Sequence, residues 1–78
     1  MDEEMQILFE NYTALMESGQ YVQLKQELNE EQPANIAEYF EELSDDKQLF
    51  IFRLLTKDVA AEVFSYMDND TQEHIVQS

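Results

Sequence analysis

The sequence contains, from Leu43 to Met67, the stretch LSDDKQLFIFRLLTKDVAAEVFSYM, which predicts two short helices joined by a tight turn. Ser44, Thr56 and Asp68 are all residue types that favour the N-cap position of a helix. They follow one another at intervals of twelve residues. A helix start that recurs at a fixed interval indicates a repeat.

Three sets of apolar residues keep the same interval. They are Phe40, Phe52 and Phe64; Leu43, Leu55 and Met67; and Tyr39, Ile51, Val63 and Ile75. Twelve residues less a tight turn leave a helix of roughly ten, and an isolated helix of that length is marginal in water. Each helix must therefore bury its apolar side on its neighbours. Two such helices make a unit of 24 residues, a length typical of helical repeats, so the pattern predicts an all-α solenoid.

The rest of the chain extends this pattern to about six short helices. An apolar stripe from Met5 to Met16 predicts the first helix. Gly19, the only glycine, suits a left-handed C-cap after it. A second helix is expected at about Gln20–Asn29, and Pro33 fits the first turn of a third.

The central helix, Asp45–Leu55, is expected to be the buried one, because apolar residues cover most of its circumference. Arg53 is the exception, and we expect its guanidinium to stay in water. The fifth helix is expected after Thr56 and the sixth from around Asp70. Because the last unit lacks the Leu or Met that would close it, we expect residues 1–78 to be a single helical-repeat domain and an incomplete N-terminal fragment of a longer protein.

The composition is strongly acidic, with 18 Asp and Glu against 4 Lys and Arg and a formal net charge of −14. This balance excludes nucleic acid, whose phosphates need a basic surface, and anionic membrane surfaces. Cations and basic protein surfaces are the partners that fit. The chain has no cysteine, and no apolar run approaches the ~20 residues of a membrane span. We therefore expect this segment to be soluble and not embedded in a membrane.

Nothing in the sequence supports catalysis, so we expect no enzymatic activity. His74 is the only histidine, is expected to be exposed near a frayed end, and can form no histidine pair for a metal. The serines lack the surroundings of an activated nucleophile. Carboxylates near the short turns could still supply part of a site for a hard cation such as Mg²⁺, which takes oxygen ligands and keeps several waters. They are Asp45, Asp46, Asp58, Glu62, Asp68 and Asp70.

Four segments resemble the cytosolic N-terminal domain of MgtE-type magnesium transporters. They are PANIAE at Pro33–Glu38, EEL at Glu41–Leu43, FRLL at Phe52–Leu55 and AAEVF at Ala60–Phe64. The resemblance covers about residues 31–78, and residues 1–30 match only as an acidic helical lead-in. The sequence departs from the family pattern at Gln32, Asn35 and Thr56, where a His, an Asp and a Pro are usual.

The resemblance implies a right-handed superhelix of short helices that precedes a pair of CBS domains and a dimeric transmembrane pore. In the family, Mg²⁺ binds between carboxylates of the N-domain and of the CBS domains and locks the pore closed. One of these ligands maps onto Glu62, in the AAEVF segment. The expected function is therefore magnesium sensing and gating by a regulatory domain at the cytoplasmic face of the cell membrane. Mg²⁺ and the CBS pair of the same chain would be its partners, in a homodimeric full-length protein.

One alternative stays open from the sequence. The chain could be an acidic protein–protein interaction module, similar to the helical repeats of flagellar motor switch proteins. In that case the carboxylates, including Glu62, would only keep the surface solvated and would have no metal role.

Overall fold

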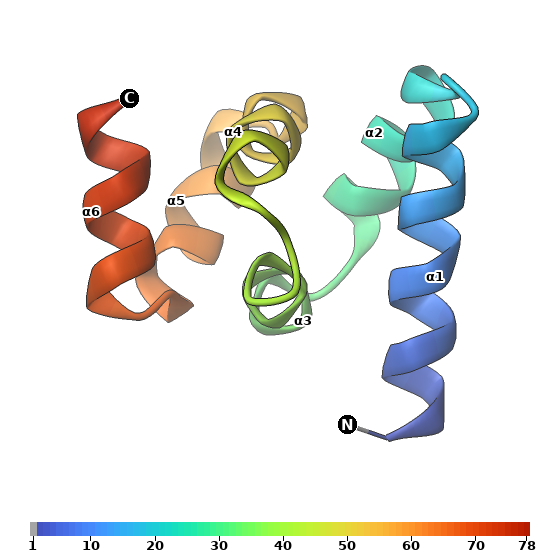
Figure 1. Ribbon diagram of the computed structural model, residues 1–78, viewed down its shortest axis with the longest axis horizontal. Helices are drawn as coiled ribbons and strands as arrows, with labels where there is room; N and C mark the ends of the chain where they lie inside the picture. The colour runs from blue at the N-terminus through green and yellow to red at the C-terminus, as the bar shows by residue number, and fades with distance from the viewer. Residues whose placement is uncertain (1) are drawn as a thin grey trace.

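The computed structural model describes residues 2–78 and places them in six α-helices, with no strand in that range. The helices are α1 (Glu3–Glu17), α2 (Tyr21–Glu30), α3 (Pro33–Phe40), α4 (Asp45–Leu54), α5 (Lys57–Tyr66) and α6 (Asn69–Gln77). Figure 1 shows α1 and α6 at opposite edges of the molecule, with α3 and α4 between them. The prediction of an all-α chain of about six short helices is confirmed.

The twelve-residue interval is confirmed and extends further than the caps indicated. Helices α2 to α6 begin at residues 21, 33, 45, 57 and 69. Each of the turns that follow α2 to α5 closes with the same backbone hydrogen bond, from the N–H of residue 31, 43, 55 or 67 to the carbonyl three residues earlier, at 3.1 to 3.2 Å. Ser44, Thr56 and Asp68 hold the N-cap positions, and of these three only Asp68 also accepts a backbone N–H with its side chain.

Two buried or half-buried glutamines are consistent with a unit of two helices. The Gln48 side-chain amide in α4 donates to the Phe40 carbonyl at the end of α3, at 2.8 Å. The Gln72 amide in α6 donates to the Phe64 carbonyl near the end of α5, also at 2.8 Å. Because a helix leaves its last carbonyls without partners inside the helix, each glutamine satisfies one such group and ties two consecutive helices together.

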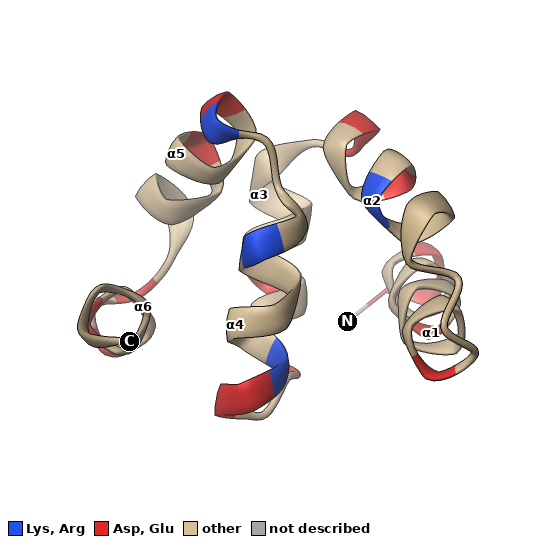
Figure 2. Ribbon diagram, turned by 90° about the horizontal axis from the view of Figure 1, so that it is seen from above, with Lys and Arg blue, Asp and Glu red and all other residues tan. Residues whose placement is uncertain are grey.

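The helices are arranged in two alternating layers. Helix α3 packs against α5, and α4 packs against α6, while α1 and α2 pack as a pair. Figure 2 shows α3 behind α4, with α5 beside α3. Contact between every second helix is the geometry of a solenoid, and it is consistent with the superhelix that the family resemblance implies.

Gly19 ends α1 as the sequence indicates. Its φ is +75°, a conformation that costs glycine nothing because it has no Cβ. The Gly19 N–H donates to the Met16 carbonyl at 3.2 Å, and the Gln20 N–H donates to the Leu15 carbonyl at 2.9 Å. This pair of bonds is a Schellman motif, which turns the chain so that α2 packs back on α1.

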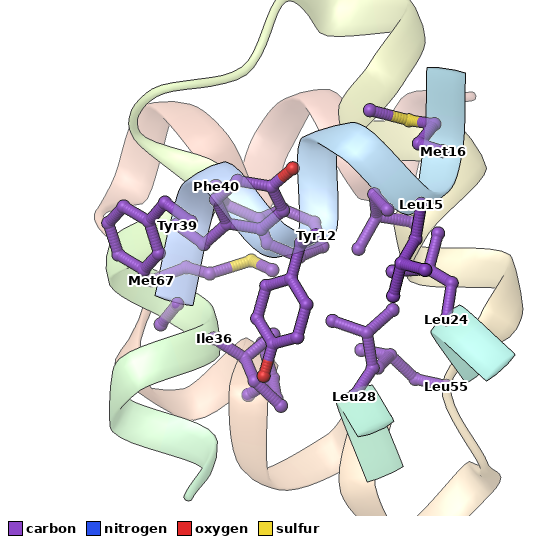
Figure 3. Packing of buried hydrophobic residues seen from close by; sticks show 14 residues of the cluster. Tyr12, Leu15, Met16, Leu24, Leu28, Ile36, Tyr39, Phe40, Leu55 and Met67 are labelled. Carbon is purple, nitrogen blue, oxygen red and sulfur yellow. The ribbon is translucent and has the colours of Figure 1, made fainter. Parts of the chain in front are cut away.

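The core runs through all helices from α1 to α5. Its buried side chains are Phe9, Tyr12, Leu15, Met16, Leu24, Leu28, Ile36, Ala37, Tyr39, Phe40, Ile51, Leu55, Val63 and Met67. In Figure 3, labelled side chains of α1, α2 and α3 point toward one another. The ring of Tyr39 lies 5.0 Å from that of Phe9 and 5.3 Å from that of Tyr12, distances at which aromatic pairs attract beyond their simple burial. Helix α1 is therefore part of the fold.

The expectation that the central helix is buried is only partly confirmed. Within α4 the buried residues are Gln48 and Ile51, and Arg53 is exposed, as predicted. Its other apolar side chains are half-buried; they are Leu49, Phe50, Phe52 and Leu54. The reason is size, because a chain this short covers only about 60% of the surface that its unfolded form exposes, and α4 has neighbours on only part of its circumference.

The core assignment can be tested at Ile51. Truncation by Ile51→Ala leaves a cavity at a position with no exposed surface, so the free energy of unfolding in urea is expected to fall by about 2–5 kcal/mol. Val76→Ala is the matched control, because Val76 is 70% exposed and its truncation should change stability by less than about 0.5 kcal/mol. Equal losses in the two variants would contradict the assignment.

Candidate functional site

Glu62 lies on the exposed side of α5, in the middle of the helix. Asp58, also exposed, lies four residues earlier, and residues at that spacing share one face of a helix. Figure 2 marks the two acidic positions of α5 in red. Helix α5 thus presents two carboxylates to solvent from one rigid element.

The structure keeps the other predicted ligands apart from this pair. Asp45 and Asp46 lie in the first turn of α4, and Asp68 and Asp70 at the start of α6. Negative charge at these places stabilises the helix dipole, which explains the residues without any ligand. Asp68 in addition accepts the Thr71 N–H at 2.8 Å, and this bond lowers the pKa of its carboxyl group.

Within residues 2–78, no group of three or more His, Asp or Glu side chains is placed so that it could hold a metal ion together. Mg²⁺ is commonly held by only one or two protein carboxylates, with water in its remaining positions. The exposed oxygens of Glu62 and Asp58 fit that role as part of a site. A complete protein cage for Mg²⁺ would need ligands from another domain.

Asn29 is a positioning residue that sequence reasoning missed. Its side-chain amide donates to the Lys25 carbonyl at 2.7 Å and to the Leu54 carbonyl at 3.0 Å, and its side-chain oxygen accepts the Thr56 N–H at 2.7 Å. One side chain therefore joins the end of α2 to the turn from which α5, and with it Glu62, begins. In the sequence the residue is an ordinary polar residue at the end of a helix, because its partners lie 25 and 27 positions away.

His74 is not simply exposed, as the sequence indicated. Its ring is half-buried, and Nε2 lies 3.2 Å from the backbone carbonyl oxygen of Asp45. The contact arises because α6 packs against α4, which sequence spacing alone does not reveal. The ring connects the last helix to the start of the central one.

Two core tyrosines have a raised pKa. Burial raises the pKa of Tyr12, and the nearby carboxylates of Glu31 and Glu27 raise it further. Burial also raises the pKa of Tyr39, although its hydrogen bond with the Thr13 hydroxyl, 2.8 Å long, acts in the opposite direction. Both phenols are thereby held neutral in the core.

The comparisons with known proteins give one family. A sequence model of the MgtE intracellular N domain matches residues 31–78, which is more than half of the chain and contains α3 to α6. No curated protein and no solved structure matches significantly. None of the helices that the structure describes is long and apolar enough to cross a membrane.

The hydrogen bonds of Asn29 to the α4–α5 turn predict that removing its side chain lowers the stability of the fold. In Asn29→Ala the Leu54 carbonyl and the Thr56 N–H both lose their partner, and the free energy of unfolding should fall by about 1–3 kcal/mol. Asn11→Ala is the control, because the Asn11 amide makes only an exposed hydrogen bond to Glu27 and should cost less than about 0.5 kcal/mol. The free energies of unfolding of both variants are measured by urea denaturation. Similar losses in the two variants would mean that the hydrogen bonds of Asn29 do not stabilise the fold more than an exposed hydrogen bond does.

The tyrosines predict a loss of stability at high pH. The unfolded chain releases phenol protons at a pH of about 10, whereas the folded chain holds those of Tyr12 and Tyr39 more tightly. The unfolded state therefore binds fewer protons above that pH, and stability must fall as the pH rises further. Tyr12→Phe should make this fall shallower in urea titrations from about pH 8 to about pH 11. An unchanged slope in Tyr12→Phe would refute the explanation.

Proposed function

The chain belongs to the MgtE intracellular N domain family, and from that premise we propose that it is a regulatory domain of a magnesium transporter which contributes carboxylates to Mg²⁺ sensing. The observation that carries the proposal is the match over α3 to α6, which contains four of the five helices that follow the twelve-residue interval. The family consists of transporter domains and is not a known family of enzymes.

Glu62 is the ligand we assign to the Mg²⁺ site, with Asp58 one turn earlier on the same helix as its neighbour. The support is chemical, since both offer exposed hard oxygen atoms, which Mg²⁺ prefers. A CBS domain pair of the same protein would supply the remaining ligands. The ion would be shared between two domains and held weakly by each alone.

The gating role follows from charge. With a formal net charge of −14, this domain repels any other acidic surface that is brought against it. Two unit charges 4 Å apart interact by about 4 kcal/mol at the effective dielectric constant near a protein surface. A divalent cation between the two surfaces replaces this repulsion by attraction, and the domains separate again when the ion is lost. Association of the two domains would thereby report the Mg²⁺ concentration.

The residues of this chain that serve such a switch do so by holding α5 in place. Asn29 fixes the start of α5 through the Thr56 N–H. Val63, which has no exposed surface, anchors the buried side of the helix in the core. Glu62 is thus carried by a rigid helix, and an ion bound there acts on the whole domain.

The cellular setting is part of the same proposal. The domain would lie at the cytoplasmic face of the cell membrane, attached to the transmembrane part of a homodimeric transporter. The competing hypothesis is that the chain is an interaction module whose carboxylates bind no metal. It predicts that association with the partner does not depend on Glu62.

Glu62→Gln tests the ligand. The substitution removes one charge at an exposed position, so folding should be nearly unchanged. The Mg²⁺-dependent affinity for the CBS pair of the full-length protein, measured by calorimetry, should fall about ten-fold, which corresponds to about 1.4 kcal/mol. Glu38→Gln, which removes an exposed carboxylate from α3, should change the affinity by less than about two-fold. Equal behaviour of the two variants would mean that Glu62 holds no metal.

An NMR titration separates binding from screening. MgCl₂ and NaCl are added to the chain at equal ionic strength, and the amide shifts are compared. Shifts confined to the neighbourhood of Glu62 and Asp58, and seen with MgCl₂ only, would show that α5 binds the ion by itself. Small shifts spread over the acidic surface and equal in both salts would show charge screening. Whether Glu62 binds Mg²⁺ would then be determined by the calorimetric comparison of Glu62→Gln with Glu38→Gln.

A further inference from the structure

An open groove of about 480 Å³ lies along α1, on the side that faces the end of α3 and the turn that follows it. Its floor is apolar and comes from Phe9, Ala14, Tyr39 and Leu43. Phe9 and Tyr39 form the buried base of this floor, only 6% and 1% exposed, and their ring centroids lie 5.0 Å apart with the ring planes tilted by 40°. The floor is therefore rigid, and its volume lies in the range of ligand-binding pockets in proteins.

Three carboxylates line the same groove. Glu10 and Glu17 come from α1, and Glu42 comes from the turn opposite. All three are exposed. Because seven residues of α-helix span about 10 Å, the two α1 carboxylates lie two turns apart along the groove, with the third across from them.

We propose that this groove docks a basic amphipathic helix of a partner protein. Apolar side chains of that helix would rest on the exposed Ala14 and the half-buried Leu43, and its Lys or Arg side chains would pair with the three carboxylates. Two basic residues seven positions apart on the partner match the spacing of Glu10 and Glu17, since both helices have the same rise. Recognition of a helix by its apolar face in a groove, with charges at the sides, is a recurring mode of peptide binding.

The charge of the chain favours a basic helix over other occupants. A second copy of the chain would bring another formal charge of −14 and would be repelled, as would nucleic acid or any other polyanion. The three carboxylates are not among any group of described residues that could hold a metal ion. The wall formed by α1 lies outside residues 31–78, which the family model matches, so this binding goes beyond the proposed magnesium role and does not depend on it.

The probe is a synthetic peptide of about 14 residues, or four turns, with Leu at positions i, i+3, i+4 and i+7 and Lys elsewhere. Its affinity is measured by calorimetry, and its position is mapped by amide shifts of the 78-residue chain. A peptide of the same composition with the Leu positions scrambled is the first control. Binding of the amphipathic peptide should shift the amides of Phe9, Thr13, Tyr39 and Leu43 more than those of α5 and α6.

Two triple variants distinguish peptide binding at the groove from non-specific attraction by the net charge of the chain. One carries Glu10→Gln, Glu17→Gln and Glu42→Gln. The other carries Glu30→Gln, Glu38→Gln and Glu73→Gln, all at exposed positions outside the groove, and changes the net charge equally. The groove variant should lose about ten-fold or more in affinity, which corresponds to about 1.4 kcal/mol, whereas the control variant should lose less than about two-fold.

A third variant tests the shape of the groove without changing its charge. Ala14 is exposed on α1 and lines the groove, so Ala14→Trp fills part of it and should weaken the peptide about ten-fold while leaving the helical circular dichroism unchanged. Equal losses in the two triple variants, equal binding of the scrambled peptide, or shifts centred outside the groove would overturn the proposal. Concentration-dependent shifts of the groove amides without any peptide would do so as well, because they would assign the groove to a second copy. Glu62→Gln should bind the peptide normally, which distinguishes this result from the test of the magnesium site.

Discussion

No helix between α2 and α6 is longer than ten residues, and none of them would be stable alone in water. The packing of the helices compensates for their short length. Helices α2 to α5 each contribute one or a few buried side chains to a shared core, whereas α6 buries none and packs on α4. Helix α3 packs against α5 and α4 against α6, so the fold is held by contacts between helices. Only α1, with 15 residues, has a length at which a helix begins to persist by itself, and it closes one edge of the array.

The second requirement is that the frequent helix ends find hydrogen-bond partners. Short helices have many ends for their length, and each end leaves backbone groups without partners inside the helix. Backbone bonds across the turns satisfy some of these groups at every step of the repeat. Side-chain amides satisfy others: Gln48 and Gln72 within two-helix units, and Asn29 between α2 and the α4–α5 turn. Among the described residues no buried side-chain nitrogen or oxygen lacks a partner.

How far the sequence predicts this structure depends on the range of the interactions. The interval of twelve, the caps at Ser44, Thr56 and Asp68, and the left-handed Gly19 are local, and the sequence predicts all of them. The half-exposed α4, the contact of His74 with the start of α4 and the joint at Asn29 depend on which helices meet, and periodicity does not encode that. Glu62 illustrates the same limit for the site: the sequence places it on a helix, and the structure shows it exposed beside Asp58, but its proposed role rests on the family. The groove along α1 was not foreseen, because its walls come from segments about 30 positions apart and close only through tertiary packing.

The regular interval also determines which changes of length the chain can accept. Inserting one residue into an α-helix rotates everything after it by about 100° around the axis. An insertion in the first turn of α4, between Asp45 and Gln48, would turn the Gln48 amide away from the Phe40 carbonyl and move Ile51 out of the core. A deletion would do the same in the opposite sense. Homologous sequences should therefore differ by substitution within α3 to α6, and changes of length there should come as whole units of 24 residues, which restore both the amide contacts and the alternation of the layers.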